Sequence, residues 1–198
     1  VVPRRRQPFD YRLHVQWSSG ETALLGDAYR YGPLISDADL HFLAEGSHQR
    51  PYEVLGSHVM ALGEGPYRLE GVRFAVWAPN ASRVSVVGSF NDWDGRRHPM
   101  RSRGASGVWE LFVPHVQKGD LYKFEIRSSD GQVLPLKSDP YARASQVRPA
   151  NASVVPQALG PRRALPASRG PANHRQAPIS VYEVHASSWK SGSSGGFP

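Results

Sequence analysis

Apolar and polar side chains alternate strictly along the segment FDYRLHVQW, at residues 9–17. The aromatic and aliphatic side chains fall on one side, and Asp10, Arg12, His14 and Gln16 fall on the other. A period of two residues over this length predicts a half-buried antiparallel strand, and the SSGE that follows it predicts a turn. Because the pattern begins almost at residue 1, we expect this strand to be the end of a sheet whose earlier strands precede the chain.

A short helical pattern follows in SDADLHFLAEGSH, at residues 36–48. Ser36 or Asp37 is a candidate N-cap, Leu40 and Leu43 form a brief apolar stripe, and Gly46 is a candidate stop signal. The segment therefore predicts one brief helix or turn.

The strand signals become regular from residue 71 onward. Alternating or apolar runs occur at residues 71–79, 83–88, 107–114 and 121–131, and residues 132–140 offer a shorter edge strand because Pro135 cannot donate to a central ladder. Short strands separated by turns, with little helix, predict an all-β fold, an immunoglobulin-like antiparallel β-sandwich. Trp77 and Trp109 lie in strongly alternating strands, so we expect both to be structural or half-buried.

The last third of the chain has a different character. Residues 151–178 are rich in proline and arginine, which predicts a basic linker. Residues 179–184, ISVYEV, form a largely apolar strand suited to burial on both faces. We expect this strand to be the first of a further domain that continues past residue 198.

The amino-acid composition excludes several kinds of functional site. The chain has no cysteine, which excludes disulfides, thiolate catalysis and cysteine-ligated metals and mildly favours a reducing compartment. The eight histidines show no metal-ligand spacing, so we expect neither a metal nor a cofactor. No apolar stretch is long enough to cross a bilayer, and no signal peptide opens the chain. We therefore expect a cytoplasmic protein that binds no membrane.

The net charge of +7 raises the hypothesis of nucleic-acid binding. Residues 4–6 form one short basic cluster, and the linker carries four arginines and no acidic residue, but neither is a folded basic face. We therefore expect no nucleic-acid partner, and steep salt dependence of DNA binding would be the contrary observation.

Five stretches of the chain stand in a characteristic order and spacing. They are YRYGPLISDADLHFLAEGSHQRPYEVLGSH, GVRFAVWAPNASRVSVVGSFNDWDGRRHPM, GVWELFVPHVQKGDLYKFEI, LKSDPYA and PISVYEVHASSW. Together they resemble the N-terminal region of bacterial 1,4-α-glucan (glycogen) branching enzymes, over about residues 9 to 190. The middle of the chain resembles the family 48 carbohydrate-binding module. The stretch AEGSHQRPYEVLGSH narrows the resemblance to branching enzymes over debranching and trehalose-releasing relatives.

The resemblance implies four parts. They are the end of an N-terminal β-sandwich with a connecting segment (1–45), the carbohydrate-binding-module sandwich (46–150), the linker (151–178) and the first strand of a truncated (β/α)8 catalytic barrel of the α-amylase type (179–198). It implies that the whole enzyme cleaves an α-1,4-glucan and transfers the chain to a 6-hydroxyl in glycogen biosynthesis. The implied partners are an α-glucan and the chain's own downstream barrel.

No catalytic residue is assigned within these 198 residues. Retaining glycosyl transfer needs two carboxyl groups about 5 Å apart, and in a barrel enzyme they follow later strands. Glu183 lies in the predicted first strand, where we expect a structural role. The fragment alone should therefore be inactive, and its role would be to bind or position glucan. A stand-alone glucan-binding or scaffold module, or the N-terminal part of a debranching or trehalose-releasing enzyme, remains the alternative.

The candidate sugar site lies in the loop SFNDWDGRRHPM, at residues 89–100. A glucose ring needs a flat aromatic surface together with polar partners for its hydroxyls, and Trp93 with Asn91 and Asp94 offers both. In binding-competent relatives the resemblance implies a tryptophan in this loop, a lysine in the YKF strand and a second tryptophan after the DG turn. Trp93 and Lys123 match the first two positions, whereas Val133 occupies the third.

Loss of that second ring predicts an affinity about tenfold or more below that of a two-ring platform. Structural roles stay open for both matched residues. Trp93 could pack against residues 96–99 or against a following domain, and Lys123 could be a solvated strand lysine.

Overall fold

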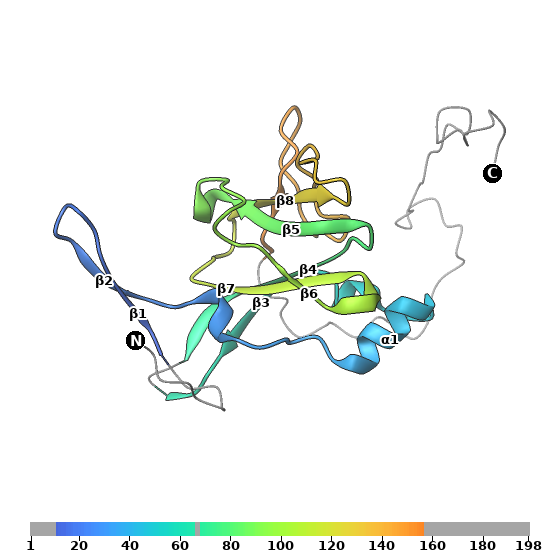
Figure 1. The fold of residues 1–198 in the computed structure, drawn as a ribbon, viewed down its shortest axis with the longest axis horizontal. Coiled ribbons are helices and arrows are strands. Elements are labelled where there is room, and N and C mark those ends of the chain that lie inside the picture. Colours follow the sequence, from blue (N-terminus) through green and yellow to red (C-terminus); the bar gives the residue numbers. More distant parts are fainter. Residues whose placement is uncertain (1–10, 66–67, 157–198) are drawn as a thin grey trace, which may run out of the picture. The chain divides into compact units, whose positions relative to one another are not determined.

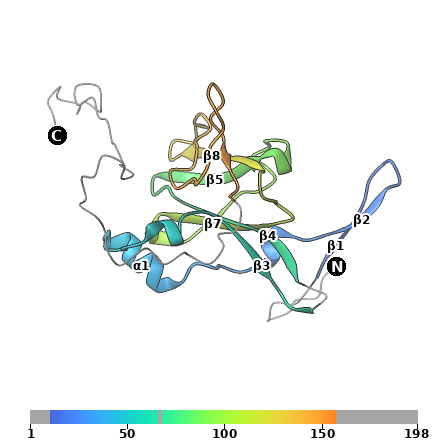
Figure 2. The same cartoon turned by 180° about the vertical axis from the view of Figure 1, so that it is seen from behind.

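The computed structural model describes residues 11–65 and 68–156, in which two antiparallel sheets form a sandwich (Figure 1). The first sheet has the order β3-β4-β7-β6, with β3 at Gly56–Leu62, β4 at Leu69–Trp77, β7 at Val108–Pro114 and β6 at Arg101–Ser102. The second has the order β5-β8-β9, with β5 at Ala81–Gly88, β8 at Leu121–Ser128 and β9 at Ser153–Val154. The predicted antiparallel sandwich is confirmed for this part of the chain, and Figure 2 shows the two layers from behind.

The core lies between the sheets, and the alternating pattern explains its composition. Val72 and Phe74 of β4 are buried, as are Val84 and Val86 of β5 and Phe124 of β8. These residues occupy every second position of their strands, so their side chains share the inner face. Truncating a buried phenylalanine such as Phe124 to alanine typically costs about 3 to 5 kcal/mol.

The outer face of the first sheet is covered by residues 34–55, here called the cover segment. It holds helix α1 at Asp37–Glu45 and the 3-10 turn η2 at Pro51–Glu53. Ser36 is the N-cap, since its Oγ accepts a hydrogen bond from Asp39 N at 3.1 Å, and Gly46 ends the helix at φ 73°. Only glycine adopts that left-handed conformation without strain, so the predicted helix and both of its boundaries are confirmed.

Buried charges anchor the cover segment to the sheet. Glu110 of β7 accepts hydrogen bonds from the backbone N–H groups of Leu34 and Ile35, at 3.0 and 3.1 Å, and also pairs with Arg103. Arg73 of β4 donates to the Val54 carbonyl at 3.0 Å. Alternation alone would place both charges in solvent, but the cover segment buries them.

Residues 98–102, here called the strap, cross from one sheet to the other. Val86 N donates to the His98 carbonyl at 3.1 Å, and Met100 N donates to the Val84 carbonyl at 2.7 Å. The strap then becomes β6, which pairs with β7. It therefore occupies the edge of β5 that β8 leaves free.

The N-terminal part of the described chain is a hairpin of β1 (Leu13–Gln16) and β2 (Thr22–Leu25), followed by the 3-10 turn η1 at Ala28–Arg30. The predicted strand and turn are both present, and Gly20 N donates to the Trp17 carbonyl at 2.9 Å. The apolar side chains Leu13 and Trp17 are exposed, whereas Tyr11 and Val15 are half-buried, so the predicted half-burial is found only in part.

Other predictions meet the structure only in part. Residues 132–140 pair with β8 through isolated bridges at Val133 and Lys137, which is less than the predicted edge strand. Trp109 is half-buried and donates from Nε1 to the Ala78 carbonyl at 3.0 Å, whereas Trp77 is 57% exposed, unlike the prediction. The strand at 179–184, most of the linker and the barrel start lie outside the described residues. The four-part division of the chain stays a prediction.

Candidate functional site

The loop that links β5 to the strap carries Trp93 in an unusual backbone conformation. After the 3-10 turn η4 at Ser89–Asn91, both Asp92 and Trp93 have positive φ, at 56° and 59°. Aspartate tolerates this left-handed region, but a bulky tryptophan adopts it only at a cost of roughly 1 to 3 kcal/mol. Such strain persists only where surrounding contacts fix the backbone, and it concentrates at binding sites.

The contacts that fix the loop centre on Asn91, whose side chain is 1% exposed. Its Oδ1 accepts a hydrogen bond from Gly88 N at 2.8 Å, and its Nδ2 donates to the Val86 carbonyl at 2.9 Å. Nδ2 also lies 2.8 Å from Nδ1 of His98. Trp93 N then donates to the Gly88 carbonyl at 3.1 Å, so the strained residue is tied to the same end of β5.

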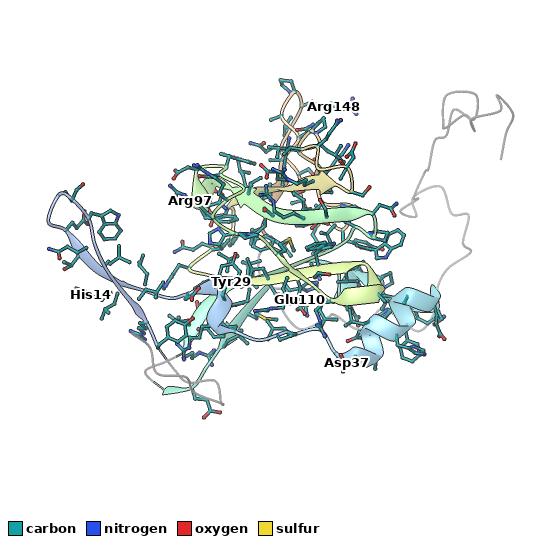
Figure 3. The ribbon with its side chains drawn as sticks, viewed as in Figure 1. His14, Tyr29, Asp37, Arg97, Glu110 and Arg148 are labelled. Carbon is teal, nitrogen blue, oxygen red and sulfur yellow. The ribbon has the colours of Figure 1, made fainter. Side chains whose placement is uncertain are left out.

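Ion pairs brace the loop on its exposed side. The guanidinium of Arg96 donates to both carboxylate oxygens of Asp94, with Nη2 to Oδ2 at 2.7 Å and Nε to Oδ1 at 2.9 Å. These bonds, together with one from Arg96 N, hold the pKa of Asp94 far below its usual range. Arg97, which is labelled beside β5 in Figure 3, pairs with Asp92 at 2.7 Å. Because these groups face solvent, the pairs orient the loop more than they stabilise the fold.

The loop lies against the outer face of β8. Lys123, Glu125 and Arg127 alternate along this strand with the buried side chains of Tyr122 and Phe124. A Cβ added to Gly95 would stand 2.3 Å from the Glu125 carboxylate, so a larger residue there would require this side chain to move. The outer face of β8 and the Trp93 loop therefore form one continuous surface, here called the β8 face.

The two other positions that the resemblance singled out also lie on the β8 face. Lys123 donates from Nζ to the side-chain oxygen of Asn151. Val133 bridges to Arg127 and is 51% exposed. Since a strand rises about 3.3 Å per residue, Lys123 and the Arg127–Val133 pair stand about 13 Å apart. The β8 face thus runs from Trp93 past Lys123 to an exposed valine at its far end.

Residues 54–142 of this chain match the family Carbohydrate-binding module 48 (Isoamylase N-terminal domain). Over these residues the sandwich is similar to a carbohydrate-binding module 48. The match begins within the cover segment and ends shortly after Lys137, which bridges to β8, so it contains the whole β8 face apart from Asn151. The predicted module is confirmed at this level, whereas the narrower resemblance to branching enzymes stays a prediction.

Solved structures with similarity to the chain include several pullulanases. PulA from Klebsiella pneumoniae is 27% identical, with a TM-score of 0.40, and the match covers 52% of this chain and 9% of that one. Pullulanase from Bacillus acidopullulyticus is 24% identical, with a TM-score of 0.41 and coverage of 52% and 12%. Apo pullulanase from Paenibacillus barengoltzii is 24% identical, with a TM-score of 0.38 and coverage of 59% and 18%. The chain thus spans less than a fifth of each of these proteins, and TM-scores below 0.5 carry no argument about function.

The four predicted sugar-binding residues have different positions in the module. Trp93 is 38% exposed, and Lys123 is half-buried, so both are accessible to a ligand. Asp94 lies in the same loop but is held by Arg96. Asn91 is buried and its polar atoms already have protein partners, so in this structure it positions the loop and cannot face a sugar.

Sequence reasoning missed other residues that build the β8 face. Glu125 pairs with Arg83 of β5, and Gly95 of the loop lies close to the Glu125 carboxylate. The sequence did contain a signal for Glu125. It follows Lys123 by two residues in a predicted strand, so both side chains are expected on the same face. The sequence suggested only that His98 packs against Trp93, whereas in the structure its ring lies within hydrogen-bond distance of Asn91.

The module shows no candidate metal centre among the described residues, since no group of three or more histidine and acidic side chains gathers there. None of the described helices is long and apolar enough to span a membrane. The described side chains of the β8 face can offer an aromatic ring at Trp93 and a hydrogen-bond donor at Lys123.

A second accessible surface lies on the other side of the sandwich. A cavity of about 570 Å³ lies beside α1 and is lined largely by apolar side chains, among them Leu43, Leu55, Trp77, Pro140 and Tyr141. Trp77 ends β4 in regular strand conformation. This groove lacks the braced loop found at Trp93.

Proposed function

We propose that the module binds α-glucan on the β8 face, with Trp93 stacking on a sugar ring and Lys123 donating to sugar hydroxyls. The observation that carries this proposal is the left-handed backbone of an exposed tryptophan, held by a buried asparagine. The left-handed backbone costs free energy at a tryptophan, and a ligand contact by the exposed part of the indole is a reason for that strain to persist. Stacking on the apolar face of a sugar supplies one, and the match to a carbohydrate-binding family supports it.

The neighbouring polar groups support a neutral and hydroxyl-rich ligand. Asp94 keeps a carboxylate beside Trp93, and its orientation is fixed by Arg96. Lys123 already donates to the amide of Asn151, a bond that a sugar hydroxyl could replace without leaving a charge unpaired. Arg83 and Glu125 compensate each other, so this pair adds no net charge to the face between Trp93 and Val133.

Calorimetric titration of maltoheptaose into the 198-residue chain tests the proposal. With one aromatic ring available, we expect a dissociation constant of about 0.1 to 1 mM, equivalent to roughly 4 to 5.5 kcal/mol. Trp93→Ala should weaken binding about tenfold, because a stacking contact contributes about 1 to 2 kcal/mol.

Trp77→Ala is the matched control, since it removes an exposed tryptophan of the same module from the opposite side. It should leave the affinity within about twofold of wild type. Equal affinities for Trp93→Ala and wild type would rule out the Trp93 site.

Val133→Trp should strengthen the binding of maltoheptaose. Val133 is exposed at the far end of the β8 face, so an indole there would meet little steric resistance. A second stacking ring should raise the affinity about tenfold. No gain, in a variant that unfolds at the same temperature as wild type, would mean that the bound glucan does not reach Val133.

For the whole protein, the proposal is the N-terminal region of a 1,4-α-glucan branching enzyme. The support is the resemblance carried by AEGSHQRPYEVLGSH and the adjoining stretches. The two carboxyl groups that such an enzyme needs would belong to a following barrel, and the 198 residues alone should not turn over glucan. Because the family description names isoamylase, a debranching enzyme is the competing assignment.

Assays of the full-length protein separate these two enzymes. A branching enzyme lowers the iodine absorbance of amylose and creates α-1,6 linkages without releasing reducing ends. A debranching enzyme releases reducing ends from a branched α-glucan such as amylopectin and creates no new branch. The proposal includes a cytoplasmic location, which cell fractionation with an antibody to the module would check.

A further inference from the structure

The buried amide of Asn91 dictates the protonation state of His98. Gly88 N can only donate and the Val86 carbonyl can only accept, so Oδ1 must face the former and Nδ2 the latter. The second hydrogen of Nδ2 then points along its 2.8 Å contact with Nδ1 of His98. That nitrogen must accept, so the imidazole is neutral and carries its hydrogen on Nε2.

His98 reaches the end of β5 through its main chain as well. Its carbonyl accepts from Val86 N at 3.1 Å, while its ring closes the bond network of Asn91. The same asparagine accepts from Asp94 N through its own carbonyl at 3.1 Å. Trp93 is enclosed between these fixed points, which is the condition for holding a left-handed tryptophan.

We propose that His98 is a positioning residue for Trp93, and that glucan binding to the module requires the unprotonated Nδ1 of His98. This inference rests on the proposed function of the β8 face. A proton on Nδ1 would set two donors against each other at 2.8 Å. The amide of Asn91 would then have to turn or withdraw, which frees the strained backbone of Trp93 to relax and misplaces the indole.

The surroundings favour the neutral ring at neutral pH. Burial is the main cause that lowers the pKa of His98 below its ordinary value, and the neighbouring charge of Arg97 adds to it. Protonation of His98 therefore needs a more acidic solution than protonation of an ordinary histidine does. The neutral α-glucan has no titratable group in this range, so a loss of binding on acidification would arise from the protein.

Other charged groups surround the ring. Arg97 is paired with Asp92, and Asp94 is paired with Arg96. His98, His115 and Asp120 all line one cavity of about 460 Å³. Tyr29 donates from its hydroxyl to the carbonyl of Pro99 at 2.8 Å.

Asp120 is already engaged by Gln117 N and by Ser89 Oγ, at 2.7 and 3.0 Å. None of these groups would be removed by a substitution at His98. A comparison of variants at position 98 therefore isolates the contribution of this ring from that of every other titrating group.

The decisive experiment compares wild type, His98→Asn and His98→Leu by maltoheptaose calorimetry between pH 7.5 and pH 5. The Asn side chain can place an oxygen acceptor where Nδ1 stands and does not titrate, whereas Leu offers no acceptor. Wild type should lose about tenfold in affinity on acidification, a change of about 1.4 kcal/mol. His98→Asn should match wild type at pH 7.5 and stay within about twofold of that value at pH 5. His98→Leu should bind about tenfold more weakly at both pH values.

Equal pH profiles for wild type and His98→Asn would overturn the inference, and so would full affinity in His98→Leu. A second readout needs no sugar. In protein labelled with 5-fluorotryptophan, the ¹⁹F resonance of Trp93, assigned with Trp93→Phe, should shift with the titration of His98 and lose that shift in His98→Asn. A resonance unaffected by His98 would mean that the ring does not position the loop. If the resonance shifts but Trp93→Ala binds as wild type does, the proposed function fails and the positioning role stands.

Discussion

The two outer faces of the sandwich are built in opposite ways. On the first sheet, the cover segment buries Arg73 and Glu110 and leaves an apolar groove beside Trp77. On the second sheet, the charged side chains of β8 remain accessible, and a strained loop adds Trp93 to them. Both tryptophans are exposed, but only Trp93 is held by a dedicated polar network. Exposure alone therefore does not distinguish the two tryptophans, whereas backbone strain and the polar network around it do.

The variant with the largest expected effect, Glu110→Gln, tests whether the two outer faces of the sandwich are stabilised independently of each other. Glu110→Gln keeps an acceptor for Leu34 and Ile35 but removes the negative charge that faces the buried guanidinium of Arg103. The free energy of unfolding should fall by about 3 kcal/mol in urea titration. Maltoheptaose binding by the folded variant should equal that of wild type. Weaker binding would show that the two faces are coupled.

On the other face, Asn91→Ala should act on both stability and binding. It leaves Gly88 N and the Val86 carbonyl without their side-chain partner, which should cost about 2 kcal/mol of unfolding free energy. The indole should also lose its position, so affinity should fall as far as in Trp93→Ala. An unchanged affinity at full folding would show that the loop does not need its buried amide.

The outer face of the first sheet also shows where reading the sequence succeeds and fails. Local rules were sufficient for β4, β5, β7 and β8 and for both ends of α1, because alternation and caps act over a few residues. They were insufficient for Arg73 and Glu110. The burial of these charges depends on a segment that is distant in sequence, and alternation assigns polar positions to solvent.

The candidate site could be predicted from the sequence about as far as the fold could. The loop sequence grouped Trp93 with Asn91 and Asp94, as the structure does. It could not reveal that Asn91 faces inward, since asparagine at an exposed turn and asparagine in a buried bond network have the same local pattern. The positive φ of Trp93 likewise has no signal in the sequence, because tryptophan seldom adopts it.

Replacing each of the two tryptophans by glycine and by alanine should give opposite orders of stability at the two positions. At Trp93, with φ 59°, Gly should be more stable than Ala by about 1 kcal/mol, because glycine adopts the left-handed region without strain. At Trp77, in a regular strand, Ala should be more stable than Gly by about 0.5 to 1 kcal/mol. Thermal unfolding of the four variants measures both differences. The same order at both positions would remove the evidence for strain at Trp93.

The smallest effect concerns the ion pair that braces the loop. The pKa of Asp94 is lowered chiefly by its hydrogen bonds to Arg96, so the stabilising contribution of the ionised group is present above its ordinary value near 4. That contribution is lost as the pH falls through the lowered pKa. Asp94→Asn should therefore unfold at a slightly lower temperature than wild type at pH 6, and the difference should shrink below pH 4. A difference that grows with acidity would contradict this.

The strap has a consequence for how the module behaves in solution. An open strand edge is a template on which other chains can add and aggregate. By bonding to Val84 and Val86 along β5 and then joining β7, residues 98–102 occupy such an edge and link the two sheets there. The residues that present the tryptophan loop thus also protect the module from self-association, and insertions in the strap should reduce solubility before they alter the core.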